Sequence, residues 1–314
     1  MPEQAEHGNR RGARTVTVLG GSGFLGRRIV KGLLERNYSV RAVSRHAERV
    51  RQHFSSHLKA PEAIKADILD ATQVSAAIAG SYAVVNAVSL YVEHREQTFE
   101  RVHVKAAADL ASASHHAGVR LFVQISGIGS DSRSTSPYIK ARGRGEEVVK
   151  NAFSGALVVR PAVMTGPDDA FLTTLVRLVR LLPVYPLFGD GSTRLQPVYV
   201  EDVAVGVARL IDGASETDSH TFEFGGPRVF TYKELMQEIA RQVDTRIRLV
   251  PMPFAVWKAL AAVAEVLPGA PLTRNQVELM REDNVTRMGM HGLAQLGIKP
   301  TDIDQVIRMI ERHT

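Results

Sequence analysis

Cysteine is missing from this sequence of 314 residues. Its absence excludes disulfide bonds and thiolate metal ligands, and it fits a reducing compartment. No uninterrupted apolar run reaches about 18 residues, so the sequence contains no clear membrane-spanning helix. Residues 1–14 are polar and basic without an apolar centre, which predicts a disordered lead-in rather than a secretory signal.

Aromatic residues are few, at 6%, and the charge is only mildly unbalanced, since 39 Lys and Arg against 33 Asp and Glu give a net charge of +6. The basic residues are scattered rather than gathered into a stripe with aromatics, which argues against nucleic-acid binding. The positive excess favours anionic cofactors, acidic lipid or an acidic protein partner. With 44% hydrophobic residues, the chain is typical of a globular protein, either one large α/β domain with a smaller lobe or two domains.

Near the chain start, a strand-like run ends in glycines at G-x-x-G-x-x-G spacing: Gly20, Gly23 and Gly26. A helix-like apolar periodicity follows at once. In such a turn the first glycine permits the sharp bend, the second lets the backbone approach a pyrophosphate, and the third lets the helix pack against its strand. The helix N-terminus adds unpaired N–H groups that attract phosphate. These glycines, with Phe24 and Leu25 between them, are therefore the predicted phosphate-binding residues for a dinucleotide.

The end of the second predicted strand, 38–45, should contact the adenosine ribose of that dinucleotide. A carboxylate there would bind the ribose 2′-hydroxyl and favour NAD(H). The sequence instead has Ser44, Arg45 and His46. Since arginine pairs with a 2′-phosphate, Arg45 favours NADP(H) over NAD(H). The alternative is that Arg45 is a solvated residue at a strand end.

Four more strand-like runs alternate with helical patterns: 63–67, 82–88, 120–126 and 157–161. This alternation predicts a Rossmann-type doubly wound parallel sheet over 15–165, with a smaller C-terminal α/β lobe over 166–314 interleaved with that core. Ligands of such folds bind at the carboxyl ends of the strands. The residues at those ends are further cofactor-binding candidates: Asp67, Ile68, Asn86, Ala87, Val88 and Pro161. Asp67 is either an acceptor for the adenine amino group or a turn aspartate.

Several helix ends carry capping signals. A long helix is expected over 97–117, with His115–His116 near its end as cap residues. Adjacent helical residues point in different directions, so a shared metal is not predicted for this pair, and no metal site is predicted elsewhere. Glu201–Asp202 is expected to cap the helix that follows it. Thr231, with Glu234 three residues on, has the pattern of a capping box.

The strand at 120–126 ends in Ser126, and Tyr138 follows twelve residues later. Together with the glycine spacing, Ser126 and Tyr138 resemble the short-chain dehydrogenase/reductase superfamily, in its extended and atypical branches. Longer blocks, among them 160–172 and 196–204, are similar to one atypical family, the NADPH-binding accessory subunits of respiratory complex I and their bacterial relatives. The similar blocks cover the chain nearly end to end.

The resemblance implies a mechanism and one departure from it. In the superfamily the tyrosine, here Tyr138, protonates a substrate carbonyl as hydride arrives from the nicotinamide, and the serine, here Ser126, holds that oxygen. A lysine four residues after the tyrosine binds the nicotinamide ribose and lowers the tyrosine pKa, but this sequence has Arg142 there. Arginine supplies charge and bonds ribose hydroxyls, yet it cannot relay a proton at neutral pH. The resemblance therefore implies cofactor binding by Tyr138 and Arg142, with weakened catalysis.

Three functions remain open from the sequence. The first is a protein of the complex I accessory type, which holds NADP(H) in a structural, assembly or redox-sensing role with a protein partner. The second is an active NADP(H)-dependent oxidoreductase for a small or lipid-like carbonyl, with Tyr138 as acid. The third, a sugar-nucleotide epimerase or dehydratase, follows only from the extended relatives.

A helix-like segment over 253–267 is apolar except for Lys258 and Glu265. So wide an apolar face needs cover. We expect it to pack onto the main domain or in a dimer, and the alternative is a surface for a protein partner or a membrane interface. The segment is too short to span a bilayer. The expected location is therefore the cytoplasm, with peripheral contact at the inner face of the membrane as the alternative.

Overall fold

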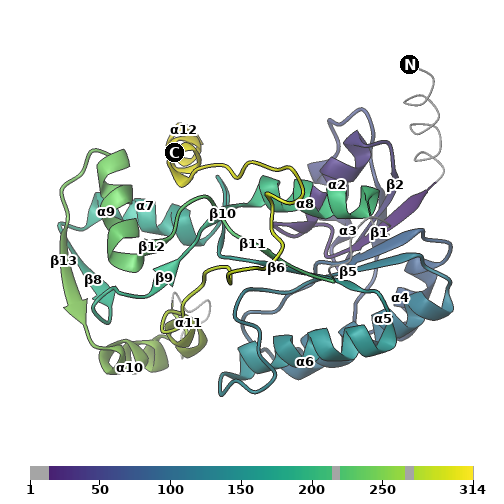
Figure 1. Ribbon diagram of the computed structural model, residues 1–314, viewed down its shortest axis with the longest axis horizontal. Coiled ribbons are helices and arrows are strands. Elements are labelled where there is room, and N and C mark those ends of the chain that lie inside the picture. Colours follow the sequence, from purple (N-terminus) through teal and green to yellow (C-terminus); the bar gives the residue numbers. More distant parts are fainter. Residues whose placement is uncertain (1–13, 214–219, 266–271, 314) are drawn as a thin grey trace.

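The computed structural model describes residues 14–213, 220–265 and 272–313 (Figure 1). The lead-in expected over 1–14 lies outside these ranges except for its last residue. The centre is a seven-stranded sheet in the order β3-β2-β1-β4-β5-β6-β11, with all neighbours parallel. Its strands are β1 (Thr15–Leu19), β2 (Ser39–Ser44), β3 (Glu62–Lys65), β4 (Ala83–Asn86), β5 (Leu121–Ile125), β6 (Leu157–Pro161) and β11 (Thr221–Phe224).

Helices cover both faces of this sheet, which confirms the doubly wound prediction. The strands are apolar on both faces, as buried parallel strands are. One face packs against α2 (Gly26–Glu35), α3 (Ala47–His53) and α8 (Val200–Asp212). The other packs against α4 (Ala71–Ile78), α5 (Ala106–His116) and α6 (Pro137–Ala152). The strand order reverses between β1 and β4, and ligands of open α/β folds bind at such a switch point.

The helix expected over 97–117 is divided into a π-helix, η1 (Glu100–Lys105), and α5. The wide turns of η1 place His103 in the interior, where it is 6% exposed. Helix α6 approaches η1 closely at Gly145, where a Cβ would lie 2.1 Å from the His103 carbonyl oxygen. The glycine thus lets α6 lie against η1, and this packing fixes the start of α6 beside the ends of β4 and β5.

The C-terminal half adds a second core, built from α7 (Phe171–Leu181), α9 (Tyr232–Gln242) and α12 (Ile303–His313) with short strands. Thr231 caps α9 through the predicted box, because its Oγ1 accepts from Glu234 N–H at 3.1 Å and Glu234 accepts from Thr231 N–H at 2.7 Å. The cap predicted at Glu201–Asp202 was wrong, because α8 already begins at Val200 and the Asp202 carboxylate binds Thr301 instead.

The remaining elements are β7 (Met164–Thr165), β8 (Val184–Phe188), β9 (Arg194–Leu195), β10 (Val198–Tyr199), β12 (Phe230–Thr231), β13 (Arg248–Met252), α10 (Phe254–Ala264) and α11 (Arg274–Leu279).

Helix α10 corresponds to the apolar segment expected over 253–267, of which 266–267 lie outside the described residues. It packs through Trp257, whose ring centroid lies 4.3 Å from that of Phe188 and whose Nε1 donates to the Leu187 carbonyl at 2.9 Å. Val256 and Val263 are 43% and 72% exposed. Helix α10 therefore packs onto the rest of the chain only in part, through Trp257 and the buried Ala261, and the expected cover of its exposed residues in a dimer stays a prediction. In the ranges that the structure covers, no helix is long and apolar enough to cross a membrane.

Candidate functional site

The glycine turn after β1 has the backbone geometry that its sequence predicts. Gly20 has φ +79°, which favours glycine, and a Cβ there would lie 2.8 Å from the Ala87 carbonyl oxygen at the end of β4. A Cβ on Gly26 would lie 2.1 Å from the Gly20 carbonyl oxygen. At Gly23 the added atom would meet a single neighbour, the Gly20 oxygen at 3.1 Å. Gly20 and Gly26 therefore make the turn possible, and Gly23 leaves its outer side open.

The start of α2 offers hydrogen-bond donors beside this open side. Across the described part of the chain, the N–H groups of Phe24, Leu25 and Gly26 make no hydrogen bond, as is usual in a first helical turn. The side chains of the first two point elsewhere. Leu25 is buried in the core, and the Phe24 ring lies under the Arg28 guanidinium, 4.5 Å from it. Only the backbone of these residues faces the turn.

The end of β2 presents hydroxyl and guanidinium groups. Ser44 Oγ lies 2.7 Å from Ser22 Oγ of the glycine turn and accepts from His46 N–H at 3.1 Å. Arg45 is exposed and forms no ion pair or hydrogen bond within the described ranges. The His46 ring lies 3.4 Å from the Glu48 carboxylate. Thus Arg45 is the cationic side chain at this strand end that is available to an anion.

The other strand-end candidates have structural partners. Asp67 accepts from Leu69 N–H at 3.0 Å, the geometry of a turn aspartate, and Ile68 packs against the core. Asn86 is buried and donates to Gln124 on β5 at 3.0 Å, while its own oxygen accepts from Val88 N–H at 3.2 Å. Ala87 approaches the glycine turn through its carbonyl, and the Pro161 carbonyl accepts from Ile128 N–H at 3.1 Å. Each of these strand-end residues is therefore held by contacts within the protein.

Tyr138 and Arg142 are brought together in the first turns of α6. Arg142 Nη1 donates to the Tyr138 hydroxyl, one helical turn away. The Nε atom of Arg142 is buried and has no hydrogen-bond partner among the described residues. A buried donor without an acceptor is costly, so this atom fits a site where a bound group supplies the missing oxygen.

Aromatic side chains enclose the Tyr138 ring, which is 4% exposed. Its centroid lies 5.6 Å from Tyr91, 5.4 Å from Phe99 and 5.7 Å from His103. Burial raises the pKa of Tyr138 to about 12, although Arg142 acts in the opposite direction. The hydroxyl therefore carries its proton at neutral pH, and can donate it to a hydrogen bond but not act as a base.

Ser126 lies at the end of β5 but is engaged elsewhere. Its hydroxyl donates to Glu146 on α6 at 2.5 Å and lies 3.0 Å from Ser130 Oγ. Glu146 also accepts from Arg160 at 2.6 and 2.9 Å, and Arg160 in turn lies 3.4 Å from Glu223. No hydrogen bond joins Ser126 to Tyr138 among the residues described. The structure thus brings Tyr138 and Arg142 together and ties Ser126 into a buried ionic network.

Five residues beside Tyr138 or Ser126 escaped the sequence analysis: Ser89, Tyr91, His103, Gly127 and Glu146. The Ser89 side chain lies close enough to Tyr138 to act against the rise of its pKa. Glu146 had a usable signal, because it follows Arg142 by four residues and so shares its helix face. The remaining three, Tyr91, His103 and Gly127, lie in a loop, a π-helix and a strand end. No short-range sequence periodicity indicates residues in such places.

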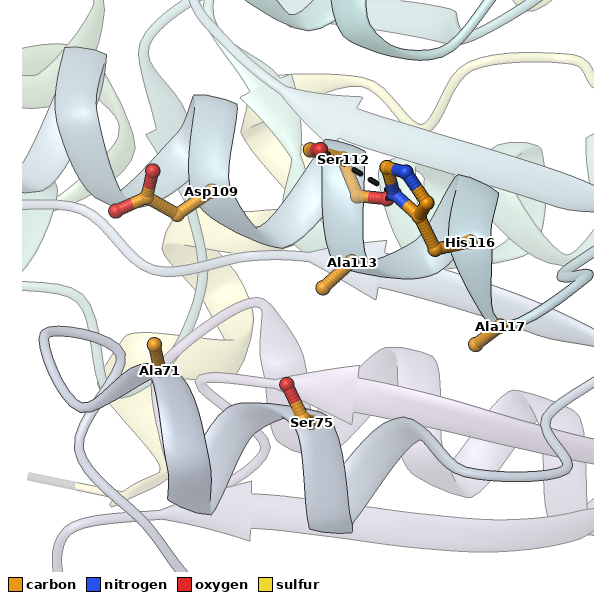
Figure 2. A pocket seen from close by; sticks show the side chains of 7 residues that line it. All are labelled: Ala71, Ser75, Asp109, Ser112, Ala113, His116 and Ala117. Atoms are coloured by element: carbon orange, nitrogen blue, oxygen red, sulfur yellow. Dashed lines mark hydrogen bonds between the residues drawn. The ribbon is translucent and has the colours of Figure 1, made fainter.

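A depression of about 610 Å³ lies between α4 and α5, and none of the candidate site residues lines it (Figure 2). His116 Nδ1 there lies 2.7 Å from the Ser112 carbonyl oxygen. The residue that caps α5 is Ala117, whose N–H donates to the carbonyls of Ala113 and His115, so the cap predicted at His115–His116 lies one residue further along. No group of metal-ligating side chains was found in the described ranges. The depression is lined by Ala71, Ser75, Asp109, Ser112, Ala113, His116 and Ala117.

Comparison with known proteins gives concordant matches. A family model described as NAD(P)H-binding matches residues 20–181. The chain is similar to mitochondrial NADH dehydrogenase (ubiquinone) 1 alpha subcomplex subunit 9 of Arabidopsis thaliana, with 33% identity over 249 residues, 78% of this chain and 62% of that protein. The chain thus spans less than two thirds of that relative's length. This match agrees with the family predicted from the sequence blocks.

Two further matches concern reductases. Ceramide reductase of Caulobacter vibrioides is 28% identical over 241 residues, 76% of this chain and 73% of that protein. Among solved structures, triphenylmethane reductase of a Citrobacter species superposes with a TM-score of 0.74 over 95% of this chain and 99% of that one. At 16% identity, the latter match shows the shared fold alone.

Proposed function

Because this chain belongs to the NAD(P)H-binding family, we propose that it holds NADP(H) between the glycine turn and the Tyr138–Arg142 pair. We further propose that the nucleotide has a structural, assembly or redox-sensing role with a partner of the respiratory-complex type. The observation that carries this role is the commitment of the Ser126 hydroxyl to Glu146. In the reductase mechanism that the family resemblance implies, that hydroxyl is free to hold the substrate oxygen.

The residues present fit a dinucleotide at both ends. The open side of Gly23 and the unpaired N–H groups at the start of α2 suit a pyrophosphate. The buried Nε of Arg142 lacks an acceptor, which a ribose hydroxyl would supply. When bound, a nicotinamide nucleotide supplies hydride chemistry, and the chain's own residues bind and orient it.

The preference for NADP(H) rests on Arg45. Its guanidinium is exposed, and the two hydroxyls of Ser22 and Ser44 lie beside the same strand end. A 2′-phosphate accepts charge-assisted hydrogen bonds from arginine. No carboxylate stands at the end of β2 to bind an unphosphorylated ribose.

The partner role rests on two observations. The similarity to a subunit of NADH dehydrogenase (ubiquinone) supports membership of a larger assembly. Helix α10 exposes Val256, Leu260 and Val263 to solvent, and such an apolar face is suited to a partner protein or a membrane surface. Cytoplasmic residence with peripheral association follows from this proposal.

A second candidate is an NADP(H)-dependent reductase of a lipid-like carbonyl. The similarity to ceramide reductase favours it, as does Tyr138, whose hydroxyl holds its proton at neutral pH. In that reaction Tyr138 would pass the proton to the carbonyl oxygen, and Arg142 would steady the tyrosine. The Ser89 hydroxyl, rather than that of Ser126, would then be the one beside Tyr138.

Extraction of nucleotide from the purified full chain tests the proposal. We expect NADP(H) in near-equal amount to protein, identified by chromatography of the denatured sample. Retention of NAD(H), or of no nucleotide, would contradict it. Consumption of NADPH in a screen of long-chain ketones would favour the reductase.

A further inference from the structure

We propose that Gly127 is a positioning residue for Arg142. The absence of a side chain at this position lets the guanidinium lie against the end of β5 with Nη1 on the Tyr138 hydroxyl. This inference deepens the proposed function, and its nucleotide-binding part rests on it.

The geometry behind the proposal is a close approach of one side chain to one glycine. A Cβ on Gly127 would lie 3.1 Å from Arg142 Cζ, 3.2 Å from Nη2 and 3.4 Å from Nη1. These three atoms are its nearest neighbours, and all belong to the guanidinium. Cβ contacts this short are uncommon, so the guanidinium would have to shift by a few tenths of an ångström.

The backbone gives no other reason for glycine at this position. Gly127 is not among the residues with positive φ, so other residues can adopt its conformation. Gly129, two residues on, does have φ +82°, and nothing lies within 4 Å of its Cβ position. The two glycines of this loop therefore serve different needs, since Gly129 permits a turn and Gly127 provides room.

The guanidinium has little freedom to move elsewhere. Nη1 is fixed by the Tyr138 hydroxyl, and the guanidinium carbon lies 5.3 Å from the centre of the Tyr138 ring. Glu146 is the nearest acidic residue on the same helix face, but its oxygens already accept from Arg160 and Ser126. A methyl group at 127 would thus weaken the bond to Tyr138 or turn Nε away from the nucleotide.

A lysine at 142 would not meet the same obstacle. The lysine ammonium is compact and lacks the planar guanidinium group that lies against Gly127. A side chain at position 127 therefore conflicts with arginine at position 142 in particular. Substitution of Arg142 by lysine should make alanine at position 127 tolerable.

A double-mutant cycle of four full-length proteins tests this coupling: wild type, G127A, R142K and G127A/R142K. We expect G127A to weaken NADPH binding about tenfold (~1.4 kcal/mol) in the wild-type background. In the R142K background the same change should alter affinity less than about twofold, a rescue that a general folding defect would not give. Urea unfolding without nucleotide should follow the same pattern, with a loss of stability in G127A that disappears in the R142K background.

Gly32→Ala is the matched control, because a Cβ on Gly32 also faces an arginine, at an ordinary 3.6 Å from Arg36 Nη1. It should leave NADPH affinity unchanged. Equal effects of G127A in both backgrounds, or no effect in either, would overturn the inference. If the wild type does not bind NADPH, the proposed function fails, and the unfolding cycle alone decides whether Gly127 and Arg142 are coupled.

Discussion

The glycine turn and the Tyr138 cluster are two parts of the candidate site, and they are held by different contacts. The turn is fixed by the backbone, since Gly20 and Gly21 N–H groups both donate to the Val43 carbonyl, at 2.9 and 3.0 Å. The cluster is fixed by side chains, with Tyr138 enclosed by aromatic rings and bonded to Arg142. Substitutions in the glycine turn should therefore distort the backbone, whereas substitutions in the Tyr138 cluster should change which side chains are in contact.

This difference bears on function. A backbone turn binds phosphate whatever chemistry follows, because N–H groups and the helix dipole supply the attraction. Side-chain partners decide whether a bound nucleotide reacts, and here the Ser126 hydroxyl is committed to Glu146. We therefore expect the glycine turn to govern binding alone, whereas the side chains around Tyr138 govern both binding and reactivity.

The largest effect is expected at the glycine turn. Gly26→Ala places a Cβ 2.1 Å from the Gly20 carbonyl oxygen, a backbone atom that cannot rotate away. We expect the free energy of unfolding to fall by about 3 kcal/mol, the upper end for overpacking, as measured in urea. Gly23→Ala is the control, since it should cost less than about 1 kcal/mol of stability while it weakens NADPH binding. Equal stability losses for the two variants would contradict this account of the turn.

The second largest effect is expected from charge reversal at Arg45, at the end of β2. Arg45→Asp removes charge-assisted hydrogen bonds to a 2′-phosphate, so NADPH affinity should fall about a hundredfold (~2.7 kcal/mol). NADH affinity should change little, and titration calorimetry with both nucleotides measures the ratio. Arg51→Asp, an exposed arginine of α3, controls for net charge. Equal losses for both nucleotides would remove Arg45 from the phosphate-binding role.

A fall in pH should lower the free energy of unfolding through protonation of His103, which packs against Tyr138. Burial, together with the nearby charge of Arg142, lowers the pKa of His103 from 6.5 to about 4. The unfolded chain therefore takes up this proton first, and stability present at neutral pH is lost as the pH falls from 6.5 towards 4. The loss is about 1.4 kcal/mol per pH unit, and His103→Gln should remove it.

Unfolding titrations at several pH values test this, with the exposed His46→Gln as control. A variant at 103 that keeps the wild-type pH dependence would show that His103 is not the group responsible.

The smallest effect is expected at the tyrosine hydroxyl. Tyr138→Phe should leave NADPH affinity within about tenfold (~1.4 kcal/mol) of the wild type, because the hydroxyl is bonded to Arg142 and faces the chemistry more than the cofactor. Fluorescence titration measures it. A collapse of binding would instead identify the hydroxyl as a ribose ligand.

The sequence was sufficient for features that depend on local backbone demands. Glycine spacing predicted the turn, and Thr231 predicted its capping box, because both reflect rules that act within a few residues. The alternation of strands and helices predicted the sheet for the same reason. The Ser126–Glu146 bond was not foreseen, since it joins residues twenty positions apart on different elements. The burial of His103 could not be predicted from the sequence, because the residue lies in the π-helix η1. The wide turns of a π-helix point a side chain away from the direction that it has in an α-helix.

Exchange of the bound nucleotide tests the central claim most directly. Protein loaded with labelled NADPH would be mixed with excess unlabelled NADPH, and the label retained by the protein would be followed in time. A structural or sensing role predicts retention over hours, because release is not part of the function. Exchange within seconds, accompanied by oxidation of NADPH when a carbonyl compound is added, would contradict it and identify an enzyme.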